Sequence, residues 1–296
     1  MKYLLPLQRY LQLIKFSHTI FAMPFALIGF SLGVQYRIDS GSGGFDNGIV
    51  TLLWVILCMV FARSAAMAFN RYLDRSIDSL NPRTATREIP AGVIAPQRAR
   101  GFVILNAGLF MLTAYLINPL CFYLSPVALL VILGYSYTKR FTALCHLILG
   151  VGLSLSVIGA YLAVTGVFQL LPLIFSIAVL TWVAGFDILY ALQDESFDRE
   201  HHLHSMPVWL GTRRSMWISS GLHVLTIAAL FFAGIWADFG FLYWIGTLLF
   251  SGLLIYQHAL VTATDLSRIN LAFMTTNGLG SVLFSVFVIL ELILHR

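Results

Sequence analysis

The sequence predicts an all-α integral membrane protein with nine transmembrane helices. The composition, the apolar stretches and the placement of positive charge all support this fold class. Of the 296 residues, 59% are hydrophobic and only 10% are charged, and the mean hydropathy is +0.85. Soluble domains carry about 25% charged residues, so the composition excludes an ordinary cytosolic enzyme, a disordered chain and a fibrous repeat. The net charge of +5 comes without a basic run, so nucleic acid is not an expected partner.

Nine apolar windows of about 20 residues are long enough to cross a hydrocarbon core of about 30 Å. They cover residues 16–36, 49–69, 101–117, 120–138, 143–165, 170–192, 215–237, 240–260 and 270–294. Only Asn118 and Pro119 separate the third window from the fourth, and this pair is typical of a helix break. Residues 1–15 carry leucines at helical spacing with basic residues between them. This pattern predicts an interfacial helix, which is retained because no cleavage site follows it.

The basic residues predict the orientation of the chain in the membrane. With the N-terminus in the cytoplasm, 15 of the 18 Lys and Arg residues fall on the cytoplasmic side, as the positive-inside rule requires. No shift in composition divides the chain, so residues 1–296 are predicted to form a single transmembrane domain. The two longer cytoplasmic loops, at 71–100 and 193–214, are the expected catalytic loops.

A first group of oxygen-bearing side chains follows the second window. Asn70, Asp74 and Asp78 are spaced by four residues, so on a helix they form one stripe. Hard oxygen ligands in a row suit magnesium, which binds one or two carboxylates together with phosphate oxygens. The alternative is a solvated helix end with ordinary acidic residues.

A second group follows the sixth window. Tyr190, Asp194 and Asp198 share a helix face with Asp187, which lies inside the apolar window. An ionisable residue within a membrane span indicates a functional site because it is costly to keep there. The alternative is an aspartate paired with a neighbouring arginine to join two helices. Two matched acidic stripes at one membrane face predict metal-assisted binding of a diphosphate, with the metal neutralising the leaving group.

Basic residues on the same side are candidates for phosphate contacts. Arg83 and Arg87 lie in a proline-bounded loop, and Tyr135 and Lys139 close the fourth window. Guanidinium groups bind phosphate or carboxylate oxygens in a forked geometry. The alternative is that these residues only set the topology of the chain, and this alternative is stronger for Lys139 than for the two arginines.

Arg63 is seven residues before Asn70, which places it about 10 Å deeper in the membrane on nearly the same helix face. A cation at that depth needs a polar cavity or a counter-ion. Asp187 is one candidate counter-ion, and an acidic substrate head is the other. Of the histidines, His204 is a weak site candidate in a solvated loop, and His146 is expected to make hydrogen bonds between helices.

Together these residues resemble the UbiA superfamily of intramembrane aromatic prenyltransferases. Its marks are an N/D-x-x-x-D-x-x-x-D motif after the second helix, an Asp-rich motif after the sixth helix, and a YxxxK element. The residues that match these elements are Asn70, Asp74 and Asp78, then Asp194 and Asp198, then Tyr135 and Lys139. Arg63, the NPRTATREIP loop, GFDILYALQDESFD and HSMP look like the 4-hydroxybenzoate polyprenyltransferase branch, which includes proteins of the futalosine route to menaquinone.

The resemblance implies a UbiA-like helical bundle in the bacterial inner membrane, with its active site facing the cytoplasm and Mg²⁺ as cofactor. The implied reaction moves a polyprenyl group from polyprenyl diphosphate to an aromatic acid of quinone biosynthesis and releases diphosphate. The acceptor is 4-hydroxybenzoate or a dihydroxynaphthoate, and no obligate protein partner is expected. The implied metal ligands are Asp74, Asp78, Asp194 and Asp198. The implied substrate-binding residues are Arg63, Asn70, Arg83, Arg87 and Tyr135, and the implied catalytic residues are Asp187, Tyr190 and Lys139.

The alternative function is a multi-span secondary transporter, because such proteins also keep ionisable residues within spans. Both acidic stripes, however, lie at span ends on one face and not at the midplane, where transporters bind their substrates. The sequence therefore favours the enzyme.

Overall fold

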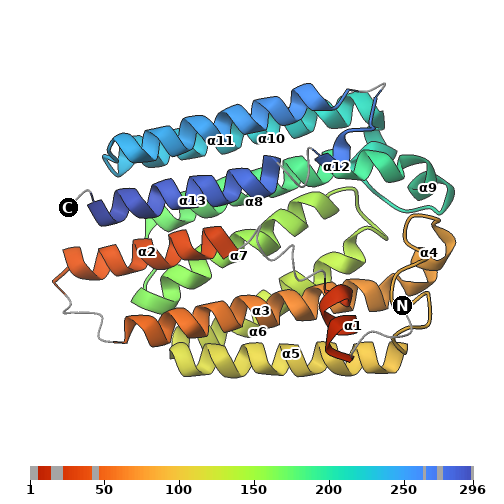
Figure 1. Ribbon diagram of the computed structural model, residues 1–296, viewed down its shortest axis with the longest axis horizontal. Coiled ribbons are helices and arrows are strands. Elements are labelled where there is room, and N and C mark those ends of the chain that lie inside the picture. The colour runs from red at the N-terminus through yellow and green to blue at the C-terminus, as the bar shows by residue number, and fades with distance from the viewer. Residues whose placement is uncertain (1–5, 15–22, 42–46, 263–264, 272–275, 295–296) are drawn as a thin grey trace.

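The computed structural model describes residues 6–14, 23–41, 47–262, 265–271 and 276–294. Within these ranges there is no strand, and the long helices run side by side along the longest axis (Figure 1). The helices are α1 (Pro6–Leu13), α2 (Met23–Asp39), α3 (Gly48–Leu73), α4 (Arg75–Leu80), α5 (Pro96–Ile117), α6 (Pro119–Thr138), α7 (Cys145–Thr165), α8 (Leu170–Ala191), η2 (Leu192–Asp194), α9 (Glu195–Glu200), α10 (Met206–Trp236), α11 (Phe241–Leu260), α12 (Ile269–Leu271) and α13 (Asn277–Leu294).

Seven of the described helices are long and apolar enough to cross a membrane: α3, α5, α6, α7, α8 with its continuation through α9, α10 and α13. The prediction of an all-helical membrane protein is therefore confirmed, but the number of nine spans is not. The other two windows correspond to α2 and α11. Residues 1–5, 15–22 and 272–275, which belong to the predicted interfacial helix and to the first and last windows, lie outside the described ranges.

The break between the third and fourth windows is confirmed, and its cause is local. The Asn118 side chain accepts a hydrogen bond from the Cys121 N–H at 2.8 Å, which caps the start of α6. Pro119 occupies the first turn, where its missing N–H has no cost. The amide of Asn118 also donates to the carbonyl of Leu162 in α7 at 2.9 Å, so the cap fixes α6 against its neighbour.

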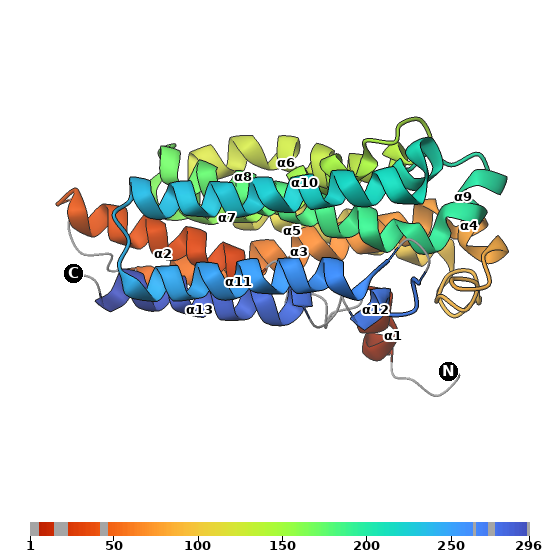
Figure 2. The same ribbon diagram turned by 90° about the horizontal axis from the view of Figure 1, so that it is seen from above.

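Six helices form a ring in which each packs on the next: α2, α7, α8, α10, α11 and α13. Its interior is apolar and aromatic, with Phe25, Phe175, Trp182 and Phe284 buried together. The remaining long helices, α3, α5 and α6, pack on one another and join this ring through α7 and α2 (Figure 2).

Close helix packing depends on glycine at some positions. A Cβ added at Gly29 in α2 would overlap the carbonyl oxygen of Val157 in α7 and lie 2.9 Å from its carbonyl carbon. A Cβ added at Gly150 in α7 would likewise overlap the carbonyl oxygen of Leu180 in α8. Small residues let helix backbones approach closely in membranes, so these glycines set the distances between α2, α7 and α8.

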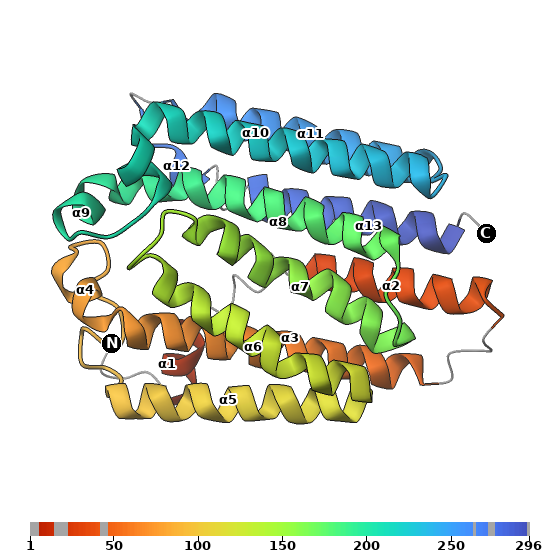
Figure 3. The same ribbon diagram turned by 180° about the vertical axis from the view of Figure 1, so that it is seen from behind.

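The two short helices α4 and α9 lie next to each other at one end of the bundle (Figures 1 and 3). α4 continues α3, and α9 continues α8 through the 3₁₀ turn η2. The fold therefore brings the two predicted catalytic loops together, although 111 residues separate Arg83 from Asp194 along the chain.

Candidate active site

A polar pocket of about 240 Å³ opens at this end of the bundle. All of the site residues predicted from the sequence line it, except Arg63 and the weak candidate His204. These residues are Asn70, Asp74, Asp78, Arg83, Arg87, Tyr135, Lys139, Asp187, Tyr190, Asp194 and Asp198. The structure thus gathers the first acidic group, the second acidic group and the basic residues around one space.

The first acidic group does not lie on one uninterrupted helix as predicted, because α3 ends at Leu73 and α4 begins at Arg75. Arg140, from the end of α6, donates to the carbonyl of Leu73 at 3.0 Å and to Asp74 Oδ1 at 3.1 Å. Arg140 thereby occupies the Leu73 carbonyl, which would accept a backbone N–H if the helix continued without a break. Burial raises the pKa of Asp74 above its ordinary value, and the hydrogen bond from Arg140 opposes this.

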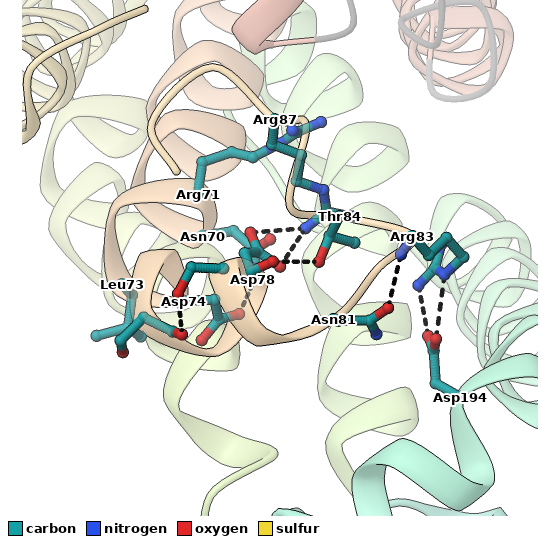
Figure 4. Close-up of polar contacts among 12 residues, drawn as sticks. Asn70, Arg71, Leu73, Asp74, Asp78, Asn81, Arg83, Thr84, Arg87 and Asp194 are labelled. Carbon is teal, nitrogen blue, oxygen red and sulfur yellow. Dashed lines mark hydrogen bonds and ion pairs between the residues drawn. The ribbon is translucent and has the colours of Figure 1, made fainter. Parts of the chain in front are cut away.

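The connection between α4 and α5 carries two arginines into the pocket (Figure 4). Arg87 Nη1 bonds to both carboxylate oxygens of Asp78, at 2.7 and 2.8 Å. Arg83 reaches across to the other predicted catalytic loop and forms a forked pair with Asp194, at 3.1 and 2.5 Å. The side chain of Asn81 accepts the Arg83 N–H at 2.9 Å, and Thr84 Oγ1 donates to the Asp78 carbonyl at 3.0 Å. These bonds fix the direction of the loop.

The second acidic group is also interrupted, because α8 ends at Ala191 and a 3₁₀ turn precedes α9. Asp194 ends this turn and Asp198 lies in α9, where its side chain is only 1% exposed. Lys139 Nζ lies 2.7 Å from Asp198 Oδ1. Tyr190 is close to the arginine of the opposite loop, since its hydroxyl accepts from Arg83 Nη1 at 3.4 Å.

Asp187 pairs with neither of the partners considered from the sequence. Its Oδ2 lies 2.7 Å from Nδ1 of His146, in the first turn of α7. Neither an arginine joining two helices nor Arg63 is its counter-ion. His146 itself lines the pocket, so the structure adds this histidine to the candidate site.

Arg63 lies in a second, apolar cavity of about 380 Å³ between α3, α5, α6 and α7. Its Nε is buried with no hydrogen-bond partner among the described residues, and the same holds for the hydroxyl of Ser156 in this cavity. Tyr135 and Leu149 line both spaces. The polar pocket and the apolar cavity therefore meet at these two side chains.

The donor set of the polar pocket suits a magnesium ion bound together with phosphate. Four carboxylates and the Asn70 side chain supply hard oxygens. Oδ2 of buried Asp198 has no hydrogen-bond donor among the described residues. In the present arrangement the carboxylates face cations, and within the described ranges no three acidic, histidine or cysteine side chains stand close enough to hold a metal by themselves.

Arg140 and His146 are the site residues that sequence reasoning missed. Arg140 follows Lys139 directly and was a visible basic neighbour, but nothing in the sequence indicated that it would reach back to Asp74. His146 follows Cys145 in an apolar stretch, and its interhelical hydrogen bond was expected without its partner. No sequence spacing links it to Asp187, which is 41 residues away.

Comparisons with known proteins agree with this geometry. The model of the UbiA prenyltransferase family matches residues 22–279. A 4-hydroxybenzoate octaprenyltransferase from Nitrosomonas europaea is 32% identical over 245 residues, which are 82% of each chain. One from Tolumonas auensis is 30% identical over 236 residues, or 79% of this chain and 82% of the relative.

Solved structures show the same architecture. The apo structure of a UbiA homolog from Aeropyrum pernix K1 has a TM-score of 0.81 at 31% identity, covering 93% of this chain and 98% of its own. A UbiA homolog from Archaeoglobus fulgidus bound to DMAPP and Mg²⁺ has a TM-score of 0.73 at 19% identity, covering 97% and 99%, and shares the fold.

The fold and the pocket define a membrane-embedded enzyme whose charged groups gather at one end of a helical bundle. The chain belongs to the UbiA prenyltransferase family, and its enzymatic class is that of a prenyltransferase. The predicted resemblance and enzyme class are confirmed, and the transporter alternative is set aside.

Proposed function

We propose that this protein transfers a polyprenyl group from polyprenyl diphosphate to the ring of an aromatic acid in quinone biosynthesis. The observation that carries the proposal is the junction at Tyr135 and Leu149, where a charged pocket meets an apolar cavity. A polyprenyl diphosphate has the same two parts, a charged head and a long apolar tail. The named relatives act on 4-hydroxybenzoate, which favours this acceptor over a dihydroxynaphthoate.

The diphosphate head belongs in the polar pocket. Asp74, Asp78, Asp194 and Asp198, with Asn70, would hold Mg²⁺, which supplies charge neutralisation and makes diphosphate a good leaving group. Arg83, Arg87 and Lys139 now face carboxylates. They would turn to the phosphate oxygens, where guanidinium and ammonium groups stabilise the charge that develops as the bond breaks.

The tail belongs in the apolar cavity, where Arg63 and Ser156 supply the only buried polar atoms without a hydrogen-bond partner among the described lining residues. We assign the carboxylate of the aromatic acid to Arg63, because a buried guanidinium is suited to a forked carboxylate contact. The ring of the acceptor then lies near Tyr135, at the junction of the two spaces.

The chemistry balances with these groups. The bond between the allylic C1 and the diphosphate oxygen breaks, and its electron pair leaves with diphosphate. A ring carbon of the acceptor forms the new bond to C1 with its own π electrons. The proton lost from that ring carbon goes to the Asp187 carboxylate, which lies in the polar pocket with Tyr190 beside it.

We infer nine membrane spans, because α2 and α11 are members of the same ring as helices that qualify. At 1.5 Å per residue, the 20 residues of α11 extend about 30 Å. The positive-inside rule places the pocket and the N-terminus in the cytoplasm of a bacterial inner-membrane enzyme. α1 is then an interfacial helix, and the whole chain forms one domain with catalytic segments at 71–100 and 193–214.

The test is turnover of purified protein in detergent with Mg²⁺, a polyprenyl diphosphate and 4-hydroxybenzoate, followed by diphosphate release and by the prenylated acid. Asp74→Ala and Asp194→Ala should each lower kcat at least about 100-fold, a loss typical of removing charge stabilisation in an active site. Chelation of Mg²⁺ should stop the wild type. Glu200→Ala, at an exposed position of α9, is the control and should turn over normally. Wild-type turnover by both aspartate variants contradicts the proposal.

A further inference from the structure

We propose that His146 is a positioning residue for this reaction, which holds the Asp187 carboxylate in the direction needed to accept the proton from the aromatic acid. The inference rests on the proposed function. Both residues line the polar pocket. The His146 side chain is 4% exposed and that of Asp187 is 27% exposed, so the imidazole is enclosed while the carboxylate faces the space where substrates bind.

The hydrogen bonds of His146 define which ring nitrogen carries the proton. The backbone N–H of Met206 donates to Nε2 at 3.3 Å. A nitrogen that accepts a hydrogen bond has no proton, so the neutral imidazole carries its proton on Nδ1. That proton is donated to Asp187 Oδ2 at 2.7 Å. His146 therefore orients the carboxylate and does not relay a proton through its far side, where the Met206 N–H already points.

The backbone that fixes Nε2 is itself held in place. Met206 begins α10, and the Ser205 side chain accepts the Val208 N–H, which caps this helix. One residue earlier, the His204 N–H donates to the carbonyl of Lys139 at 2.7 Å. The segment before α10 thus joins the end of α6 to the start of α7. The Met206 N–H is a fixed anchor for the imidazole.

This arrangement leaves one oxygen of Asp187 available. The contact with His146 involves Oδ2, and no hydrogen bond from another described residue reaches Oδ1. A carboxylate held by one oxygen presents the other in a defined direction, which general-base catalysis requires. Outer hydrogen bonds that orient metal-binding side chains change affinity or activity by about 10- to 100-fold when they are removed, and we expect the same range for the bond from His146 to Asp187.

A purely structural role would duplicate contacts that α7 and α8 already make. Gly150 lies so close to Leu180 that an added Cβ would overlap its carbonyl oxygen. The two helices therefore pack backbone to backbone at a contact that does not include His146. A second buried histidine, His223, provides a comparison, because its Nε2 lies 3.2 Å from the Trp182 carbonyl of the same helix α8 outside the polar pocket.

The experiment compares His146→Leu, His146→Asn and the matched control His223→Leu, with kcat and the KM of both substrates measured for each. Leucine removes the donor, and kcat should fall about 10- to 100-fold, while the KM of the polyprenyl diphosphate stays within twofold. Asparagine keeps an amide N–H near the position of Nδ1, so the kcat of this variant should be at least tenfold higher than that of the leucine variant. The His223→Leu control should retain the wild-type kcat.

The inference is overturned if His146→Leu keeps a kcat within twofold of wild type, or if asparagine restores nothing. Should the leucine variant fail to fold, His146→Gln replaces it, because the longer side chain places its amide at the Nε2 end and should not restore the contact with Asp187. Wild-type protein that makes no prenylated acid refutes the proposed function. An active wild type with unaffected His146 variants refutes only the role of this histidine.

Discussion

Gly159 gives a direct test of whether the apolar cavity holds the polyprenyl tail. The residue lies in α7 and lines the cavity, and an added Cβ would have no heavy atom within 4 Å. A larger side chain at this position therefore projects into open space and not into a neighbouring helix. Gly159→Phe should reduce the room for the tail without disturbing helix packing.

The expected magnitude follows from the area that the tail buries. Each buried CH₂ contributes about 0.8 kcal/mol, so one isoprene unit contributes about 4 kcal/mol when fully enclosed. The side chain of phenylalanine has more carbon atoms than one isoprene unit, so it displaces at least one. Because the displaced tail can enter lipid, part of this loss is recovered. We expect kcat/KM for long donors to fall at least about tenfold relative to short donors, which corresponds to about 1.4 kcal/mol.

The assay measures kcat/KM for donors of two to eight isoprene units with a fixed acceptor. Gly221→Phe is the control, since Gly221 is exposed on α10 and also has no neighbour within 4 Å. It should leave the preference for chain length unchanged. If Gly159→Phe lowers kcat/KM equally for short and long donors, or for neither, the tail does not occupy this cavity.

Two further predictions concern stability in detergent. Gly29→Ala should lower the free energy of unfolding by about 1–3 kcal/mol through overpacking against Val157. Thermal unfolding should show a drop of about 2–4 °C per kcal/mol, with Gly221→Ala as the control. An unchanged transition of the Gly29→Ala variant argues against close contact between α2 and α7. Glu291 is buried and accepts the Gly240 and Tyr243 N–H groups at 2.7 and 3.3 Å, so it caps α11 from α13. Glu291→Gln should cost about 1.5–3 kcal/mol, typical of a hydrogen bond to a charged group, whereas equal thermal stability of this variant and the exposed control Glu200→Gln would show that the cap contributes nothing.

The fold was largely predictable because membrane helices follow simple rules of length and composition. The break at Asn118 and Pro119 was visible in the sequence, since both residues act on their own helix end. The start of α10 was not visible in the sequence: the predicted window began at residue 215, whereas the helix begins at Met206. The apolar first turn is separated from the window by a non-helical backbone at Gly211, where φ is 77°, and by the polar residues Thr212, Arg213 and Arg214 that follow it.

The candidate site was predictable in its members and not in its pairings. Acidic residues at helical spacing indicate a shared face, but a face says nothing of which cation lies opposite. Arg83 bonds to Asp194 and Arg87 to Asp78 because the loop after α4 folds over both segments. The partner of Asp187 depends on how α7 packs on α8. Such pairings depend on tertiary packing, and a single sequence contains no pattern that predicts them.

The pairing of the charged groups sets the charge balance of the polar pocket. Asp74, Asp78, Asp194 and Asp198 each lie beside one cation. The formal charges of these four ion pairs cancel. A lone anion entering the pocket would meet carboxylates, and a lone divalent ion would meet guanidinium and ammonium groups. Only their joint arrival lets every group exchange its neighbour for an oppositely charged one. If the proposed function is correct, Mg²⁺ and diphosphate should therefore bind the pocket together more readily than either ion binds alone.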